Sequence, residues 1–302
     1  MKLILYIILL LQPILLIGQV TEDRNWCRIN CEFTDEDSLR LAQLYDNFNF
    51  SDSTAIDSLT FFPIRFAVIQ EDSSLEITKE TFEKVIEDLN TSFEGVGFAF
   101  YLHRVDLIEK EIKLEDLSNN FNNIYDRFSN MYDMKDIITV YVLDHSKEFC
   151  TISDRSISCS RTGGFSYILS NRTNNVVVSR FDLLDQKIIA HELGHFFGLY
   201  HTFEEALFGK DDFNPEHCHL VGDRICDTPP DPGALFEIYV NYSICEMKGF
   251  KTKEGHEYKP KLENFMSYYK PCYLRAYQFT PQQKMVMKKA SKLSIRKKFM
   301  RK

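Results

Sequence analysis

The sequence predicts a mixed α/β (α+β) fold, built from strands and amphipathic helices around one large core. Two observations are positional: a strand, a helix and a second strand follow one another before residue 110, and further apolar strands precede a long helix near residue 190. A third is composition, since 44% hydrophobic residues with 25 Phe and 15 Tyr supply ample apolar surface for a core.

The expected elements can be placed in order along the chain. Residues 61–69 alternate well enough for a strand, and residues 78–93 fit a helix because apolar residues recur at three- and four-residue steps behind Thr78. Strands are expected at 97–105, 137–143, 165–169 and 175–178, followed by a helix over 183–197 with Asp182 as its cap. Thr280, Pro281 and Gln283 predict the start of a closing helix.

The N-terminal residues predict an exported protein. Residues 1–18 read as a signal peptide, because one Lys precedes an apolar stretch that ends at Gly18. A membrane anchor is the alternative, but Gln12 and Pro13 interrupt a segment shorter than the roughly 20 apolar residues of a spanning helix. We therefore expect a secreted protein without a stable membrane anchor after signal removal. Residues 19–59 are acidic and polar and look like a leader or pro-segment, with ordered structure beginning at Phe61.

The charge is distributed unevenly. The net charge is −8, yet residues 265–302 contain eleven Lys or Arg and no Asp or Glu. Such a segment can contact an anionic surface or nucleic acid, but a solvated helix face is the commoner case. We expect no nucleic-acid partner.

Eight cysteines in an exported chain fit up to four disulfides. A thiolate zinc site is the competing interpretation, but Cys27 and Cys31 have no matching second pair at metal-binding spacing. Eight cysteines allow 105 pairings, so spacing alone does not give the connectivity.

The residues that indicate chemistry lie on the helix expected near residue 190. His191 and His195 are four residues apart, which places both imidazoles on one helix face, within reach of one zinc ion. Glu192 lies beside them and can take a proton from a water without being a ligand. A third ligand at His201 requires a sharp turn, which Gly198 permits. Three protein ligands and an open fourth position are typical of a catalytic zinc site.

The string from His191 to Phe203, with its His-Glu-x-x-His-x-x-Gly-x-x-His pattern, resembles the metzincin metalloproteases and, within them, the pappalysin family (M43). Two further segments are similar to that family: residues 222–230, with Cys226-Asp227-Thr228-Pro229, and residues 264–268, which resemble its Met-turn. The resemblance covers residues 61–302. It implies a metzincin-type zincin fold, with a mixed twisted sheet and active-site helix over 60–201 and a smaller C-terminal subdomain over 202–302.

The resemblance also implies roles for further residues. Met266 should form an apolar floor beneath the zinc ligands, and the Tyr268 phenol should lie near the metal, where it can stabilise an oxyanion. Disulfides are implied between Cys218 and Cys245 and between Cys226 and Cys272. Cys150 with Cys159, and Cys27 with Cys31, complete the expected set.

A calcium site and a substrate preference are weaker implications. Relatives bind calcium near the loop after the zinc motif, and the oxygen ligands available there are Asp223, Asp227, Thr228 and Asp231. Some pappalysins that cut before arginine carry an acidic residue where this chain has Lys270-Pro271-Cys272, which argues against the same preference here. His217 and His219 flank Cys218, but loop histidines are more often structural than metal ligands.

The expected activity is zinc-dependent endoproteolysis of protein or peptide substrates, with Glu192 as general base. Cys27 is a candidate zinc-blocking residue in a latent precursor, unless it pairs with Cys31. A secreted binding or adhesion protein with a structural zinc, and a zinc amidase acting on cell-wall peptides, are the alternatives. The sequence does not indicate an oligomeric state.

Overall fold

The computed structural model describes residues 35–46, 59–70, 77–109, 129–143, 147–153, 156–169, 175–204, 212–273 and 275–301, all within the unit Phe33–Lys302. The predicted signal peptide, and with it Cys27 and Cys31, lies outside these residues. None of the helices in the described ranges combines the length and the apolar character that crossing a bilayer requires.

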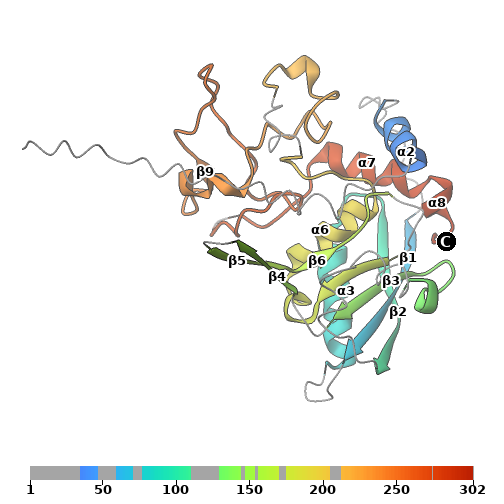
Figure 1. Ribbon diagram of the computed structural model, residues 1–302. Coiled ribbons are helices and arrows are strands. Elements are labelled where there is room, and N and C mark those ends of the chain that lie inside the picture. Colours follow the sequence, from blue (N-terminus) through green and yellow to red (C-terminus); the bar gives the residue numbers. More distant parts are fainter. Residues whose placement is uncertain are drawn as a thin grey trace, which may run out of the picture. The chain divides into compact units, whose positions relative to one another are not determined.

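A five-stranded mixed sheet forms the framework, in the order β2-β1-β3-β7-β6 (Figure 1). Strands β1 (Thr60–Gln70), β2 (Phe98–Glu109), β3 (Ile138–Leu143) and β7 (Asn175–Ser179) are parallel, and β6 (Gly164–Phe165) pairs antiparallel with β7 at the end of the sheet. The mixed α/β class is confirmed. The strand expected over 165–169 is shorter than predicted, because residues 166–169 leave the ladder.

Two helices pack against this sheet. Helix α3 (Lys79–Ser92) begins after Thr78 as expected and contacts β2, while α6 (Gln186–Phe196) contacts α3, β6 and β7. The predicted cap Asp182 is wrong: it lies in the 3-10 turn η1 (Arg180–Asp182), and Asp185 caps α6 by accepting from Lys187 N at 2.9 Å.

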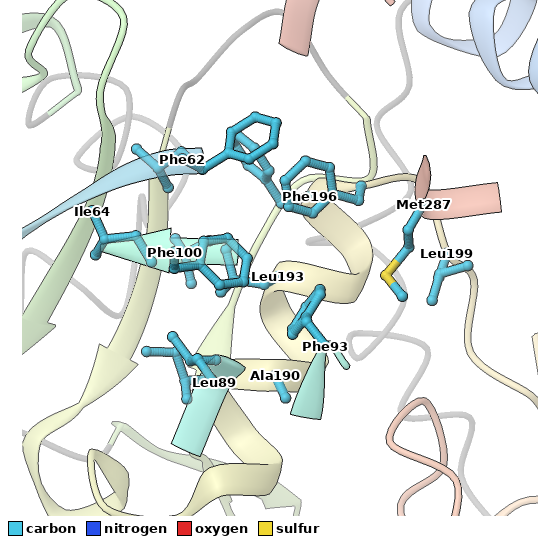
Figure 2. Packing of buried hydrophobic residues seen from close by; sticks show 14 of the residues in the cluster. Phe62, Ile64, Leu89, Phe93, Phe100, Ala190, Leu193, Phe196, Leu199 and Met287 are labelled. Carbon is cyan, nitrogen blue, oxygen red and sulfur yellow. The ribbon is translucent and has the colours of Figure 1, made fainter. Parts of the chain in front are cut away.

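The core fills the space between the sheet and these helices. Figure 2 shows buried side chains from β1, β2, α3 and α6 gathering in one cluster, among them Phe62, Phe100, Phe93 and Leu193. Helix α7 (Pro281–Ser291) adds Met287, and its Thr280–Gln283 capping box is present as predicted. Many of the aromatic residues noted in the sequence are therefore buried in this core.

The remaining elements are short. They are the hairpin β4 (Lys147–Ser153) and β5 (Ser156–Thr162), the 3-10 turns η3 (Pro215–His217) and η4 (Ala234–Tyr239), the hairpin β8 (Val240–Asn241) and β9 (Glu246–Met247), and α8 (Ser294–Lys297).

The segment expected as a leader contains a helix, α2 (Asp35–Asp46). Its residues Leu41, Leu44 and Tyr45 are buried in the main core, so the expectation that ordered structure begins at Phe61 is wrong. These three residues have helical spacing, but a single short apolar face in a polar stretch gave little signal in the sequence.

Both implied disulfides of the C-terminal region are wrong in their pairing. Cys218 bonds to Cys226, with Cα atoms 4.9 Å apart, and Cys245 bonds to Cys272, with Cα atoms 5.4 Å apart. The turns between residues 218 and 226 fold that loop back on itself, whereas Cys245 and Cys272 belong to a separate apolar cluster. In the hairpin β4–β5, Cys150 and Cys159 occupy directly opposed backbone positions, as that predicted pairing requires.

Candidate metal centre and active site

Helix α6 buries its whole last half, and with it both histidines of the motif. Opposite the histidines, Ile189, Leu193 and Phe196 pack into the core, which fixes the rotation of the helix about its axis. His191 and His195 are consequently held side by side, with ring centroids 4.6 Å apart.

The helix ends in a turn that brings in the third histidine. Gly198 has φ +93°, a conformation that L side chains rarely adopt, and its N–H bonds to the carbonyl of His195 at 2.8 Å. The chain then reverses, and His201 reaches the face of α6 that carries the other two rings. Gly198 thus lies in a turn, and His201 lies beside His195, while its role as the third zinc ligand stays a prediction.

The three histidines present one ring nitrogen each to a common point. The Nε2 atom of His195 lies 3.1 Å from Nε2 of His191 and 3.1 Å from Nε2 of His201. Nitrogens bound to one zinc at about 2.0–2.1 Å in tetrahedral geometry would lie roughly 3.3 Å apart. Among the described residues, these three form the one cluster of His, Cys, Asp or Glu that could hold a metal ion.

The opposite ring nitrogens all face acceptors. Nδ1 of His191 lies 2.7 Å from the Phe265 carbonyl, and Nδ1 of His195 lies 2.8 Å from the Leu199 carbonyl. Nδ1 of His201 lies 3.1 Å from the Glu204 carboxylate. With a proton on each Nδ1, every Nε2 turns a lone pair toward the shared point, which is the tautomer that a metal needs. Burial lowers the pKa of His191 and His195 well below the ordinary value, which also favours the neutral rings.

Glu192 follows His191 directly on α6 and is buried. It is 7% exposed, and burial raises the pKa of its carboxyl well above the usual range. A Cβ added to Gly164 of β6 would stand 2.9 Å from its Oε1 atom, so the missing side chain leaves room for the carboxylate beside the edge strand. A carboxyl with a raised pKa is suited to taking and returning a proton near neutral pH.

The Met-turn segment supports the cluster from below. Met266 is fully buried and lies against Gly194, between the two histidines of α6. Its carbonyl accepts from Thr202 N at 3.2 Å, and the Phe265 carbonyl accepts from His191. Met266 thus lies against α6, and its role as the floor of a zinc site stays a prediction.

Tyr268 stands at the open side of the cluster. Its hydroxyl lies 3.0 Å from Nε2 of His201, and the residue is 41% exposed, so the phenol joins the metal site to solvent. The structure therefore brings together all five chemistry-bearing residues that the sequence indicated, namely His191, Glu192, His195, His201 and Tyr268.

The four candidate calcium ligands serve other contacts. Asp223 accepts from Thr228 Oγ1 at 2.7 Å, and Asp227 accepts from Gln282 N at 3.0 Å. Asp231 accepts from Thr202 Oγ1 at 2.5 Å and from Tyr269 Oη at 2.8 Å. These residues do not form a metal-binding group within the described ranges, and the calcium expectation gains no support.

The neighbouring histidines do not form a second metal site in the described structure. His217 is exposed and pairs with Asp212 at 2.6 Å, and His219 is exposed.

Sequence reasoning missed two supporting carboxylates. Glu204, three residues after His201, faces that ring, and Asp231 ties the residue after His201 to the tyrosine after Tyr268. Of the two, only Glu204 could have been predicted from the sequence, because an acidic residue shortly after a metal-binding histidine can fold back onto its Nδ1.

A reprolysin family model, described as metallo-peptidase family M12, matches residues 68–230, which is more than half of the chain. The chain belongs to metallo-peptidase family M12. The match includes the three histidines and Glu192, and membership implies a catalytic zinc. The protein is therefore a metzincin-type metalloprotease, and the zinc-binding expectation rests on both the family and the geometry of the histidine cluster.

Similar proteins are known in sequence and in structure. An extracellular metalloprotease of Arthroderma gypseum is 24% identical over 78% of this chain and 74% of its own length. One of Arthroderma benhamiae is 26% identical over 54% of this chain and 53% of its own length. Two solved structures share the fold: mirolysin in complex with compound 9, at 18% identity and TM-score 0.54, and Tannerella forsythia mature mirolysin in complex with a cleaved peptide, at 17% and 0.52. Each covers 80% of this chain and 96% of the mirolysin chain.

Proposed function

We propose that this metalloprotease is a secreted zinc endopeptidase that hydrolyses internal peptide bonds, with Glu192 as its general base. The observation that carries the proposal is the convergence of the Nε2 atoms of three buried histidines, which share their helix or its following turn with a buried carboxylate and lie beside the partly exposed Tyr268. His191, His195 and His201 would hold the zinc.

Each protein group has a defined task in the hydrolysis. When bound, zinc acts as a Lewis acid that polarises the scissile carbonyl and lowers the pKa of a water. Glu192 accepts a proton from the attacking water at its carboxylate and returns it to the nitrogen of the leaving amine. Tyr268 Oη donates a hydrogen bond to the oxygen of the carbonyl as negative charge develops on it. Met266 and Gly194 keep the floor of the site dry and closely packed.

Secretion is supported by three independent features. The relatives are named extracellular metalloproteases, the described residues contain two disulfides, and residues 1–18 have the composition of a signal peptide. A latent precursor, with Cys27 as a candidate blocking residue, belongs to the same proposal. Within the metzincins, the chain also resembles the pappalysins in its Cys226-Asp227-Thr228-Pro229 segment and its Met-turn.

The test is a comparison of substrate classes with purified protein. We expect an unfolded protein to be cut at internal bonds, mapped by mass spectrometry of the products. Cleavage should stop when a chelator removes zinc and return when zinc is added. Cleavage of cell-wall peptides without cleavage of the protein substrate would establish an amidase instead. Tight zinc binding without turnover on either substrate would establish a binding protein.

A further inference from the structure

Helix α2 lies within the segment that its composition marks as a leader, yet it contacts the turn that delivers the third histidine. The Tyr45 hydroxyl donates to the carbonyl of Gly198 at 2.8 Å, and both groups are buried. The Tyr45 ring packs on the ring of Tyr200, with centroids 5.6 Å apart. Leu44 fills the space in front of Gly198, because a Cβ on that glycine would stand 2.8 Å from Leu44 Cδ2.

These contacts fall on consecutive residues of one short turn. The Gly198 carbonyl accepts from Tyr45, the next carbonyl, of Leu199, accepts from Nδ1 of His195, and Tyr200 precedes His201 directly. A displacement of the Gly198 carbonyl would therefore change the orientation of the His195 ring and the approach of His201 together. Tyr45 therefore acts on both rings through the backbone of this turn.

Helix α2 is held in place from two other elements. Lys289 of α7 donates to the Leu44 carbonyl at 2.7 Å. Helix α2 lies beside α7 (Figure 1). Arg40 donates to the Leu169 carbonyl at 3.3 Å, and the N–H of Leu169 bonds to the carbonyl of His195 at 3.1 Å. Leu41, Leu44 and Tyr45 are 1%, 0% and 6% exposed, so removing α2 would open the main core to water.

We propose that α2 is a permanent part of the mature enzyme, and that Tyr45 is a positioning residue for the zinc-binding turn. A leader is expected to be removed during maturation. A helix whose buried tyrosine is hydrogen-bonded behind a metal ligand is instead expected to stabilise the active enzyme. Maturation cleavage must then either precede Asp35 or leave α2 bound to the domain. The inference rests on the proposed zinc site.

The first test identifies which residues stay with the active enzyme. Intact-mass analysis and N-terminal sequencing of the mature, secreted protein are expected to find residues 35–46, in the main chain or as a fragment that copurifies with it. A fully active enzyme that lacks these residues would overturn the proposal.

The second test separates positioning from simple packing. The Tyr45→Phe variant keeps the ring but removes the bond to Gly198, and we expect zinc to transfer to a chromogenic chelator about 5- to 10-fold faster than from the parent. The gap between the melting temperatures of the zinc-bound and zinc-free forms should narrow, because zinc binds the variant less tightly. A purely structural role would lower both melting temperatures equally and leave zinc transfer unchanged, which would contradict the proposal.

A matched pair on the same helix provides the control. Leu44→Ala should release zinc faster, whereas Leu39→Ala, at a position 59% exposed, should behave as the parent. Equal effects from both substitutions would reject a specific contact at Gly198. These measurements need no substrate: if the variants respond as expected and the parent cuts nothing, the endopeptidase proposal fails while the role of α2 stands.

Discussion

The sulfur of Met266 lies directly against Gly194, so close that a Cβ atom on this glycine would stand 2.5 Å from it. Gly194 is in the last turn of α6, and inside a helix glycine ordinarily costs roughly 1 kcal/mol relative to alanine. The contact explains why glycine occupies this position, because without a side chain there the Met-turn can pack under His191 and His195.

Replacing a glycine inside a helix by alanine usually stabilises the protein, but we expect Gly194→Ala to destabilise it. We expect the free energy of unfolding to fall by about 1–3 kcal/mol, since overpacking costs more than the helix gains. Denaturant unfolding of the parent, of Gly194→Ala, of Met266→Ala and of the double variant measures the coupling. The double variant should recover part of the loss caused by the alanine. A more stable Gly194→Ala would show that the Met266 contact is not tight.

Glu204→Gln tests the carboxylate that faces His201. Its oxygen lies 3.1 Å from Nδ1 of that ring, and removal of its charge weakens the bond that orients the ligand. Outer partners of this kind change metal affinity by about 10–100-fold, and we expect the lower end for a substitution that keeps an acceptor. Competition with a chelator of known affinity gives the value. Glu246→Gln, which alters an exposed ion pair with Lys248, should leave zinc affinity unchanged.

Lys187 should give the protein an unusual stability profile above neutral pH. Burial lowers the pKa of this lysine to about 8, while it donates to the Tyr269 carbonyl. Between pH 8 and about 10.4 the unfolded chain therefore holds a proton that the folded chain lacks, so stability rises with pH in this window.

The comparison with Lys187→Met isolates this contribution. From pH 7.5 to 9.5 the free energy of unfolding of the parent should rise relative to the variant by about 2 kcal/mol. A constant difference between the two proteins would mean that Lys187 keeps its ordinary pKa.

Peptide mapping without reduction tests the corrected disulfides. Fragments joining Cys218 to Cys226 and Cys245 to Cys272 are expected. Replacing Cys245 and Cys272 together by alanine should lower the free energy of unfolding by about 3–4 kcal/mol, from the entropy of a loop of 27 residues. Fragments joining Cys218 to Cys245 would restore the pairing that the family resemblance implied.

The fold and the site could be predicted from the sequence to different extents. Apolar periodicity located α3, β1 and β3, because each buries one face or all of its side chains in one core. It missed α2, whose apolar face is short and is buried because it packs against the Gly198 turn. The spacing of the histidines is local in sequence and predicted their convergence. The Glu204 and Asp231 contacts depend on loop conformation, which no spacing rule gives.

The disulfides show the same limit. Four cysteines of the C-terminal region were recognised as bonded, yet their partners depend on how the loops over 218–226 and 245–272 fold, and resemblance supplied the wrong pairs. The predicted cap Asp182 lies in the 3-10 turn Arg180–Asp182, so α6 begins later and Asp185 caps it.

The central claim is that Glu192 moves the proton while the three histidines hold the metal. The most direct measurement compares the mature protein with its Glu192→Gln variant, counting bound zinc and following internal cleavage of an unfolded protein. We predict one zinc per chain in both, with cleavage by the variant reduced at least about 1,000-fold, in keeping with the loss of a general base and its charge. Near-parental cleavage by a variant that retains its zinc would contradict the account.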